Sequence, residues 1–272
     1  MILVQITDPH CRPQGMAAMR ICETNMLMER ALRAVAAFRP RPDIVVITGD
    51  LAANGLAAEY QALAAMLRRT MDGLRVYVIP GNHDRRGPLR EALDGVAGMG
   101  NDAAFMQYTV DDLAVRLVML DTLVQGSTHG ELCAARMDRL ETTLGQEPER
   151  PTLIAMHHPP FVCGLTHMDA INLRNADAFT ALVARHRQVR RIICGHHHRP
   201  VVMPVAHAIG SIAPGVAHQV ELELFNDADA QWNLEPAAFQ VHAWIAQAEA
   251  IVSHTAYVEQ YPGPYPFFAD PA

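Results

Sequence analysis

Apolar runs of strand length alternate with helical patterns through the first two-thirds of the chain. The apolar runs predict strands at 2–6, 44–47, 74–79, 113–120, 153–156 and 192–194. Apolar residues recur at helical spacing from about Thr24 to Phe38, and the prolines that follow end this pattern. Further helical patterns lie at 60–71, 133–144 and 176–186. Continuous apolar runs are typical of strands buried on both faces, so the alternation predicts an α/β fold.

The pattern changes after Arg199, where short apolar runs follow one another without long helices between them. They predict strands at 201–204, 206–209, 220–225, 239–245 and 251–258. We therefore divide the chain into an α/β core, residues 1–200, and a β-rich segment, residues 201–272. The second segment is expected to complete a second sheet and to form a cap or an oligomer contact. The proline-rich tail at 261–266 predicts irregular structure, either an arm against a partner subunit or cleft, or a loose terminus.

Composition and charge exclude several classes of function. The chain has 272 residues, of which 50% are hydrophobic and 19% charged, as in ordinary globular proteins. Its net charge of −7 gives no general attraction to nucleic acids or anionic membranes. The nearest basic group, Arg85, Arg86 and Arg90, is more consistent with a solvated surface. We therefore expect a small-molecule substrate, no membrane and no nucleic-acid partner.

Cysteine usage and hydropathy predict a reducing compartment. The five cysteines are odd in number and form no CxxC pair, so they predict neither a disulfide framework nor a thiolate zinc site. No apolar stretch reaches bilayer length, and the first apolar run is too short for a signal peptide. We expect the protein to be cytoplasmic.

Polar residues that can bind metals follow five of the predicted strands. They form the segments Asp8-Pro9-His10, Gly49-Asp50, Gly81-Asn82-His83-Asp84, His157-His158 and Gly195-His196-His197-His198. These segments hold half of the 14 histidines of the chain. Because ligand crevices form at the carboxyl ends of strands in α/β sheets, we expect these side chains to converge.

Such a convergence needs a cation, because crowded carboxylates repel one another unless they are protonated or neutralised. A ligand set of Asp, Asn and His without Cys suits Mn, Fe, Zn or Co. Each segment alone has an ordinary explanation: DxH arises by chance, GNHD is usually a turn, and paired histidines are usually surface or core residues. Their joint occurrence after apolar strands predicts a binuclear metal site.

The same segments resemble the calcineurin-like metallophosphoesterase superfamily. The blocks DPH, GDLAANG, GNHD, MHHPP and GHHH match its five signature segments in order, across residues 8–198. The phrases PDIVVITGDL, YVIPGNHD, HHPPF and PGVAHQV are most similar to bacterial class III cyclic nucleotide phosphodiesterases and the related glycerophosphodiesterases. The resemblance implies a four-layer α/β/β/α sandwich with a C-terminal cap or dimerisation extension, and two divalent ions. We also expect a homo-oligomer.

The resemblance also implies a ligand set. One ion would be held by Asp8, His10, Asp50 and His198. The other would be held by Asp50, Asn82, His157 and His196, with Asp50 bridging the two.

Two further histidines have candidate catalytic roles by the same resemblance. His83 matches the histidine beside the substrate phosphate, where it would donate a hydrogen bond to the phosphate or a proton to the leaving group. His218, in PGVAHQV, matches a substrate-side histidine of the glycerophosphodiesterase branch, and a packing role fits it equally well. The implied reaction is hydrolysis of a phosphodiester by attack of a metal-bound hydroxide on phosphorus.

Two departures from the superfamily patterns bear on this prediction. The monoesterase branch reads GDxxDRG at the second block, whereas this chain has Asn54 in place of the second acid and lacks the following Arg. One cation fewer favours monoanionic diesters over dianionic monoesters. The second departure is His197, an extra imidazole between two predicted ligands, which could support a ligand or face the substrate but which we expect to be exposed.

Three functional hypotheses remain from the sequence. The leading one is a phosphodiesterase acting on small molecules, with glycerophosphodiesters slightly favoured over 3′,5′-cyclic nucleotides. The second is a broad phosphatase or nuclease on the same metal site. The third is a non-catalytic metal-binding scaffold, against which the complete set of predicted ligands argues.

Overall fold

Two large β-sheets form the centre of the computed structural model, which describes residues 1–225 and 229–267. The first sheet has the order β13-β12-β1-β2-β3. Its parallel strands are β1 (Ile2–Ile6), β2 (Ile44–Thr48) and β3 (Val76–Ile79). The hairpin of β12 (Ala238–Ile245) and β13 (Ala250–Tyr257) joins its edge antiparallel to β1. The 3₁₀ turn η1 (Ala246–Ala248) links the two hairpin strands.

The second sheet has the order β4-β5-β6-β7-β9-β8. Its parallel strands are β5 (Arg116–Met119), β6 (Thr152–Ala155), β7 (Val189–Cys194) and β9 (Ala208–Ile212). The edge strands β4 (Tyr108–Val110) and β8 (Val201–Val205) are antiparallel to their neighbours. Two strands of the segment after residue 200 thus lie in the second sheet, and two others in the first. A small antiparallel pair is formed by β10 (Gln219–Val220) and β11 (Trp232–Asn233).

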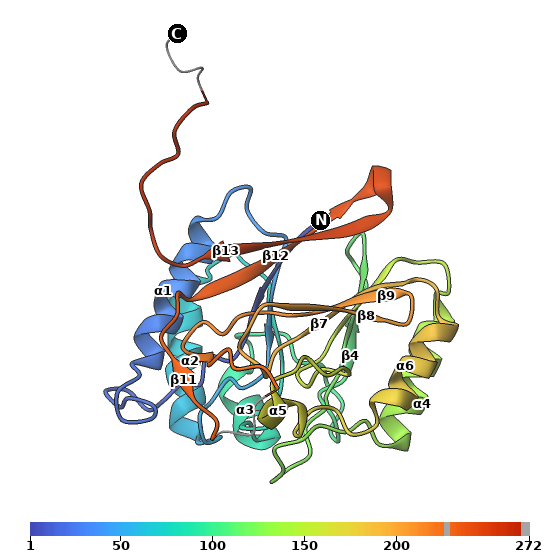
Figure 1. The fold of residues 1–272 in the computed structure, drawn as a ribbon, viewed down its shortest axis with the longest axis horizontal. Helices are drawn as coiled ribbons and strands as arrows, with labels where there is room; N and C mark the ends of the chain where they lie inside the picture. Colours follow the sequence, from blue (N-terminus) through green and yellow to red (C-terminus); the bar gives the residue numbers. More distant parts are fainter. Residues whose placement is uncertain (226–228, 268–272) are drawn as a thin grey trace.

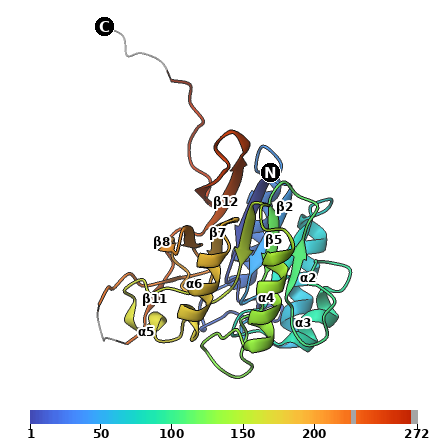
Figure 2. The same ribbon diagram turned by 90° about the vertical axis from the view of Figure 1, so that its right-hand side faces the viewer.

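Helices cover the outer face of each sheet, as Figures 1 and 2 show. The first sheet packs against α1 (Thr24–Ala37), α2 (Ala57–Thr70) and α3 (Arg86–Leu93). The second sheet packs against α4 (Ala134–Gln146) and α6 (Ala176–Arg185). The short α5 (Thr166–Asp169) lies in the loop between β6 and α6. The predicted four-layer α/β/β/α architecture is therefore confirmed.

Alternation along each central strand explains the layers. In β1, Val4 and Ile6 pack towards the helices, whereas Leu3 packs into the core between the two sheets. Val45 and Val46 of β2 divide in the same way. Successive side chains of a strand point to opposite faces, so a continuous apolar run buries both faces of a sheet. The polar residues that follow these strands then lie together at one end of both sheets.

The segment after Arg199 departs from its predicted pattern at one strand. The run 220–225 was predicted to be a strand, but β10 ends at Val220 and residues 221–225 form no ladder. Leu222, Leu224 and Phe225 are exposed. The apolar residues of this run therefore lie on the surface and do not form a buried strand.

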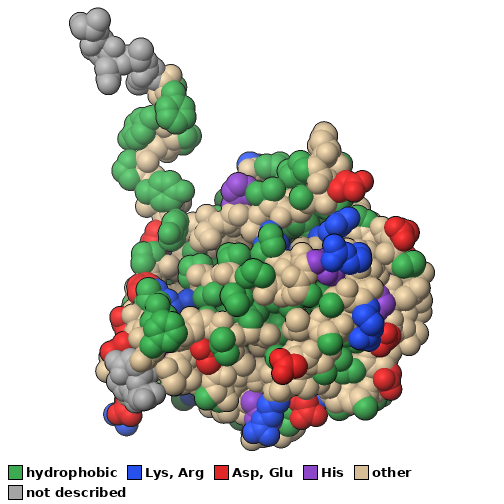
Figure 3. Space-filling model, turned by 45° about the vertical axis from the view of Figure 1, so that its right-hand side comes forward, with side chains coloured by type: hydrophobic (Ala, Val, Ile, Leu, Met, Phe, Trp, Pro, Cys, Tyr) green, Lys and Arg blue, Asp and Glu red, His purple; other side chains and the backbone are tan. Residues whose placement is uncertain are grey.

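The chain leaves the body of the protein after β13. Residues 260–267 form neither helix nor strand, as the proline-rich pattern predicted, and they extend away from the molecule (Figures 1 and 2). Tyr261, Tyr265 and Phe267 are exposed there. Figure 3 shows hydrophobic side chains along this extension. Within the described ranges, no helix has both the length and the hydropathy needed to cross a bilayer.

Candidate metal centre

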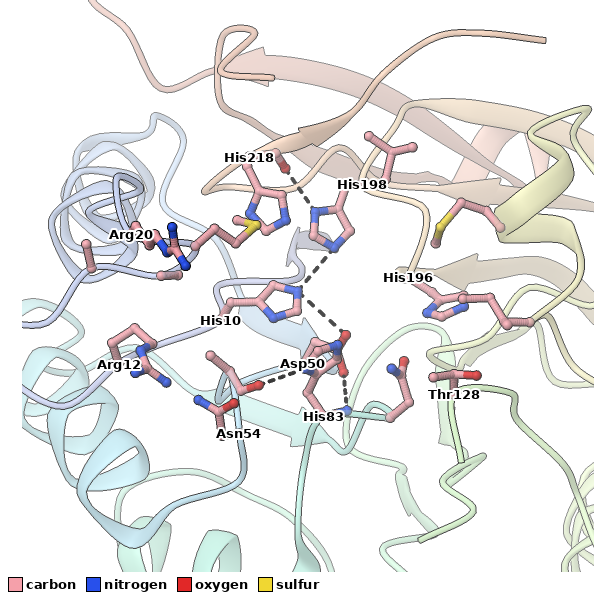
Figure 4. Close-up of a pocket in the computed structure, with 18 residues that line it drawn as sticks. His10, Arg12, Arg20, Asp50, Asn54, His83, Thr128, His196, His198 and His218 are labelled. Carbon is pink, nitrogen blue, oxygen red and sulfur yellow. Dashed lines mark hydrogen bonds and ion pairs between the residues drawn. The ribbon is translucent and has the colours of Figure 1, made fainter. Parts of the chain in front are cut away.

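The seven predicted ligands come together where β1, β2, β3, β6 and β7 end. Figure 4 shows four of them, His10, Asp50, His196 and His198. Asp50 lies at the middle, with its Oδ2 3.6 Å from His10 Nε2 and its Oδ1 3.4 Å from His157 Nε2. His198 Nε2 lies 3.4 Å from Asp8 Oδ1 and 3.2 Å from His10 Nε2. Two contacts complete the group on the other side of Asp50. Asn82 Oδ1 lies 3.1 Å from His157 Nε2, and the centroid of the His196 ring lies 5.1 Å from that of the His157 ring.

Backbone strain marks the same residues. Asp8, His10, Asp50, His196 and His198 all have positive φ, between 44° and 73°. Non-glycine residues avoid this left-handed region, and each instance costs on the order of 1 kcal/mol or more. Such strain persists only where surrounding contacts fix the backbone, and it is concentrated at functional sites. The strained conformations of these five residues therefore lower the stability of the fold, and the surrounding contacts hold them in place.

Two glycines permit the close approach of the ligand loops. A Cβ on Gly49, whose φ is 98°, would lie 2.3 Å from His157 Nδ1. A Cβ on Gly81 would lie 2.2 Å from Asp50 Oδ1. Neither position has room for a side chain, so glycine before Asp50 and before Asn82 is required for packing within the site.

Hydrogen bonds fix the tautomers of two imidazoles. His157 Nδ1 lies 2.8 Å from the carbonyl oxygen of Thr48, and His198 Nδ1 lies 2.9 Å from that of His218. A carbonyl only accepts, so in each ring Nδ1–H is the donor and Nε2 faces the centre. This is the arrangement by which metal-ligating histidines are oriented, because the outer N–H is held by a fixed acceptor.

Unpaired nitrogen in the centre also fits a metal. His196 is buried, and its Nε2 has no hydrogen-bond partner among the described residues. His198 Nε2, which is the acceptor nitrogen of its ring because Nδ1 carries the proton, lies 3.2 Å from His10 Nε2. The candidate ligand atoms, which are side-chain oxygens and imidazole nitrogens, lie 3.1–3.6 Å apart. This spacing matches that of ligand atoms around an ion whose metal–ligand bonds are about 2.0–2.2 Å long. These residues therefore fit a pair of divalent ions.

Electrostatics divide the donors into ionised and neutral groups. Burial alone would raise the pKa of Asp50, but His157 and His83 hold it well below its ordinary value. Burial lowers the pKa of His10 and of His196 well below the ordinary imidazole value, so both rings offer neutral lone pairs. Burial also opposes charge on His157, yet Asp50 and Asp8 raise its pKa to about 9. A proton on His157 thus offsets the charge of Asp50, and a cation would replace that proton.

His83 stands at the mouth of the site. Its backbone N–H donates to Asp50 Oδ1 at 2.9 Å, and its Nδ1–H donates to the carbonyl of Ala53 at 2.7 Å. Nε2 is therefore the free nitrogen of an exposed ring that lines the cavity. The Asp50 carboxylate raises the pKa of His83. The position suits a group that meets a substrate phosphate.

His218 is brought to the opposite wall. Its ring lies 4.4 Å from that of His198 and 5.2 Å from that of His10, and Trp232 contacts its other side at 5.6 Å. Burial lowers the pKa of His218 to about 2, so the ring is neutral. Its Nδ1 has no hydrogen-bond partner among the described side chains and backbone.

Asp84 supports the ligands and was missed by the sequence reasoning. Its carboxylate accepts hydrogen bonds from the backbone N–H groups of Leu51, Ala52 and Gly81 at 3.1, 3.1 and 2.8 Å. The Tyr60 hydroxyl donates to it at 3.0 Å. One buried side chain therefore ties the loop of Asp50 to the loop of Asn82. The signal was present as the last letter of GNHD, but nothing in the sequence showed which backbone groups it would meet.

A cavity of about 680 Å³ opens beside the centre and is lined by His10, Asp50, Asn82, His83, His196, His198 and His218. Arg12 and Arg20 also line the cavity, on the side opposite His196 in Figure 4. Neither residue was identified from the sequence. The charge of Arg12 is offset by the buried Glu59, which lies 2.8 Å away. Arg20 is exposed at the cavity rim. Both precede α1 in an irregular segment, where no periodic pattern predicts side-chain direction.

The expectation for His197 is wrong. It was expected to be exposed, but its side chain is fully buried, with 0% exposure, behind the two ligands that flank it. Positive φ at His196 and at His198 turns the backbone at each, so the middle ring of the three points away from the cavity into the protein.

Comparison with known proteins agrees with the fold and with a phosphodiesterase relationship. The chain is 31% identical over 98% of its length to a probable glycerophosphodiester phosphodiesterase of Arcobacter nitrofigilis, of which it covers 97%. It is 36% identical over 93% of its length to a probable cyclic nucleotide phosphodiesterase of Rhodopseudomonas palustris, of which it covers 91%. A dimetal phosphatase structure from Danio rerio has a TM-score of 0.65 at 17% identity, with 89% of this chain and 92% of that chain covered.

The match to a known family covers the chain from its first residue to the residue before β8. The model of the calcineurin-like phosphoesterases matches residues 1–200, which contain all seven predicted ligands. This family uses a binuclear centre of divalent metal ions, and the clusters of histidine and aspartate described above fit that use. The chain belongs to the calcineurin-like phosphoesterase family.

Proposed function

We propose that this protein is a metal-dependent phosphodiesterase that hydrolyses small phosphodiesters, with glycerophosphodiesters as the favoured class. The observation that carries the proposal is the convergence of Asp50 with oxygen donors from the first sheet and imidazoles from the second, beside an open cavity. The full-length similarity to a probable glycerophosphodiester phosphodiesterase supports the substrate class.

The proposed ligand sets follow the two sides of Asp50. Asp8, His10 and His198 share one ion with Asp50, consistent with the short distances among their donor atoms. The other set supports a second ion, and its members are Asp50, Asn82, His157 and His196. The ions are drawn from Fe, Mn, Zn and Co, because imidazole and carboxylate accept all four.

The second block supports a preference for diesters. Asn54 directs its backbone N–H and its side-chain amide to Glu59, at 2.9 and 3.0 Å, so it brings no charge to His83. Glu59 also offsets the charge of Arg12. The substrate phosphate therefore meets less positive charge here than in a site with a free arginine. A monoanionic diester needs less positive charge around it than a dianionic monoester does, so the site favours diesters.

In this proposal the residues divide the work of hydrolysis. When bound, the two ions would lower the pKa of a water and polarise the phosphoryl oxygens. His83, oriented by Ala53, presents Nε2 to the cavity, where it holds or delivers a proton at the leaving oxygen. His218 is neutral and lies beside His10 and His198, where it contacts the substrate as a hydrogen-bonding group and not as a cation.

A cyclic nucleotide is the second candidate substrate. A base needs a surface on which to stack, and the half-buried Trp232 packs against His218, which lines the cavity. The similarity to a probable cyclic nucleotide phosphodiesterase supports this alternative.

Paired substrates test the proposal. With Mn²⁺ present, we expect faster turnover of bis(p-nitrophenyl) phosphate than of p-nitrophenyl phosphate. Glycerophosphocholine and 3′,5′-cyclic AMP should then be compared by phosphorus NMR, and we expect the former to have the higher kcat/KM. Faster monoester turnover would overturn the diester preference. Inactivity towards all four compounds would favour a non-catalytic scaffold.

We also infer that residues 1–200 carry the catalytic ligands and that 201–272 contribute a cap and an oligomer contact. Exposed aromatic side chains on the C-terminal extension support that role (Figure 3). Truncation after Val258 should lower the oligomeric mass in light scattering while leaving the ligand loops intact. A truncated chain with an unchanged mass and full activity would rule out this role. Cytoplasmic location stays a prediction.

A further inference from the structure

A second cluster of potential metal ligands lies behind the candidate centre. Cys163 Sγ is 3.0 Å from His197 Nδ1, and the carboxylate of Asp169 completes the group. One ligand atom from each of the three residues lies within 4.8 Å of the other two. Cys163 and Asp169 come from the loop after β6, and His197 follows β7. None of the three belongs to the proposed pair of ion sites.

The proton position on His197 is fixed by Asn172. The Asn172 amide nitrogen donates to the carbonyl of Phe161 at 2.9 Å, which identifies its Oδ1 as the other amide atom. That oxygen is 2.7 Å from His197 Nε2, so Nε2–H is the donor. The lone pair of Nδ1 therefore points at Cys163 Sγ. Outer-shell hydrogen bonds of this kind orient the imidazoles of metal sites.

Asp169 is held in place before any ion binds. Its two carboxylate oxygens accept the backbone N–H groups of Cys163 and Gly164, at 2.9 and 2.8 Å. These bonds curl the loop around the carboxylate and carry the Cys163 side chain towards His197. Oδ1 also accepts a hydrogen bond from the Asn172 amide at 3.4 Å, whereas Oδ2 keeps a further lone pair, because a carboxylate oxygen accepts more than one bond. The three ligands are thus preorganised on two separate segments.

The geometry and chemistry of the group fit a zinc-class ion. Tetrahedral bonds of about 2.3 Å to sulfur and 2.0–2.1 Å to nitrogen place the two ligand atoms about 3.6 Å apart. The observed separation of 3.0 Å would therefore need to open only modestly. On binding, the S–H bond breaks, a metal–sulfur bond forms, and the proton leaves to solvent. Cys163 and Asp169 are partly exposed, so a fourth position can be reached from outside.

We propose that Cys163, His197 and Asp169 form a third metal site, which binds a zinc-class ion through one sulfur, one nitrogen and one oxygen. Thiolate is a soft ligand, so the site favours Zn²⁺ over Mg²⁺ or Mn²⁺. An ion here joins the end of β7 to the loop that carries Met168 and Ile171, two residues of the cavity wall. The odd cysteine count and missing CxxC gave no sign of it, because the fold brings its ligands together from distant positions.

Cobalt substitution tests this proposal separately from the proposed function. Thiolate bound to Co²⁺ gives a strong near-ultraviolet charge-transfer absorption, and the proposed catalytic ligands include no cysteine. We expect the absorption in the wild-type protein and its loss in Cys163→Ser. Serine preserves the size of the side chain and can still donate a hydrogen bond to His197 Nδ1, so folding should be retained. Cys133→Ser, a half-buried cysteine at the start of α4, is the matched control and should keep the absorption.

Zinc stoichiometry gives the second readout. Equilibrium dialysis and elemental analysis should find one Zn²⁺ fewer per chain in Cys163→Ser than in the wild type or in Cys133→Ser. Absence of the absorption in the wild type, or its survival in Cys163→Ser, would overturn the proposal. If the proposed ion pair is wrong, the stoichiometry of all three proteins falls while the thiolate absorption still depends on Cys163, so the two failures are distinguishable.

Discussion

The two sheets contribute different chemistry to the candidate centre. Strand ends of the first sheet supply the carboxylates Asp8 and Asp50 and the amide of Asn82, together with His10. Strand ends of the second sheet supply imidazoles alone: His157, His196 and His198. The first sheet therefore provides the negative charge that attracts cations, and the second provides neutral lone pairs that complete their coordination.

The two sides are also fixed by different means. On the first side, the Asp84 carboxylate gathers backbone N–H groups from two ligand loops. On the second side, ring N–H groups of His157 and His198 donate to backbone carbonyls. Loss of a ligand should therefore have different consequences on the two sides, and substitutions can measure that difference.

Asp50→Asn should have the largest effect, because it removes the charge shared by both proposed ions. We expect kcat to fall by roughly three orders of magnitude, as expected for losing several kcal/mol of stabilisation. Added Mn²⁺ should not restore it, since the bridging charge is absent at any metal concentration. Steady-state kinetics across a metal titration would check this. Activity within a few-fold of wild type would show that Asp50 does not bridge.

His196→Gln tests the imidazole side. It removes one neutral ligand and leaves every carboxylate, so the affinity for one ion should fall by more than the roughly 10–100-fold cost of losing an outer-shell partner. Excess Mn²⁺ should restore part of the activity, in contrast to Asp50→Asn. If metal rescues both variants equally, or neither, the proposed division between the sheets is incorrect.

Asp84→Asn addresses the support of the first side. In the wild type, both carboxylate oxygens of Asp84 accept backbone N–H groups. The substitution replaces one of these oxygens by an amide nitrogen, which only donates and so cannot bind an N–H group. The loops of Asp50 and Asn82 should therefore separate. We expect a loss of roughly 10–100-fold in metal affinity, measured by isothermal titration. Tyr60→Phe removes one of the bonds to Asp84 and is the milder companion, with a loss of only a few-fold. Equal effects of the two variants would contradict a gathering role for Asp84.

The smallest expected effect concerns the polar link between the sheets. Gln5 of β1 donates to the carbonyl of Cys194 in β7, and it accepts from His242 at 3.1 Å. Burial, followed by the charge of Arg191, lowers the pKa of His242 to about 3. The ordinary pKa of histidine is 6.5. Below that pH, His242 takes up a proton in the unfolded chain but stays neutral in the folded protein. Stability therefore falls as the pH falls from about 6.5 towards 3.

His242→Gln should remove this contribution. Its stability should decline less steeply with acid than that of the wild type, by up to about 1.4 kcal/mol per pH unit. Urea unfolding at several pH values measures the slope. His254→Gln, an exposed histidine on the neighbouring strand β13, is the control and should match the wild type. Identical slopes for all three proteins would contradict the buried neutral state of His242.

The sequence predicted the parts of the fold that depend on local pattern. Strands such as β1 and β2 are buried on both faces, so their apolar runs end sharply in the polar residues of the site. The helix α3 was missed because Gly87 and Pro88 lie in its first turn and obscure its pattern. The edge strand β4 was missed because it has three residues, too few to show a period.

Features that depend on distant contacts could not be predicted from the sequence. The partner of β10 is β11, centred on Trp232, and not a longer strand through residues 221–225. His197 is buried because its neighbours adopt left-handed backbone conformations, which no letter in GHHH reveals. The positions of Arg12 and Arg20 depend on the path of an irregular loop. Residue types and their order after strands thus predict ligands, whereas supporting contacts require the three-dimensional structure.

Anomalous diffraction from crystals grown with Mn²⁺ tests the central claim most directly. We expect two peaks about 3.5–4 Å apart on either side of the Asp50 carboxylate, one near Asp8 and one near Asn82. A single peak, or peaks that do not contact Asp50, would contradict a shared ion pair at the meeting of the two sheets.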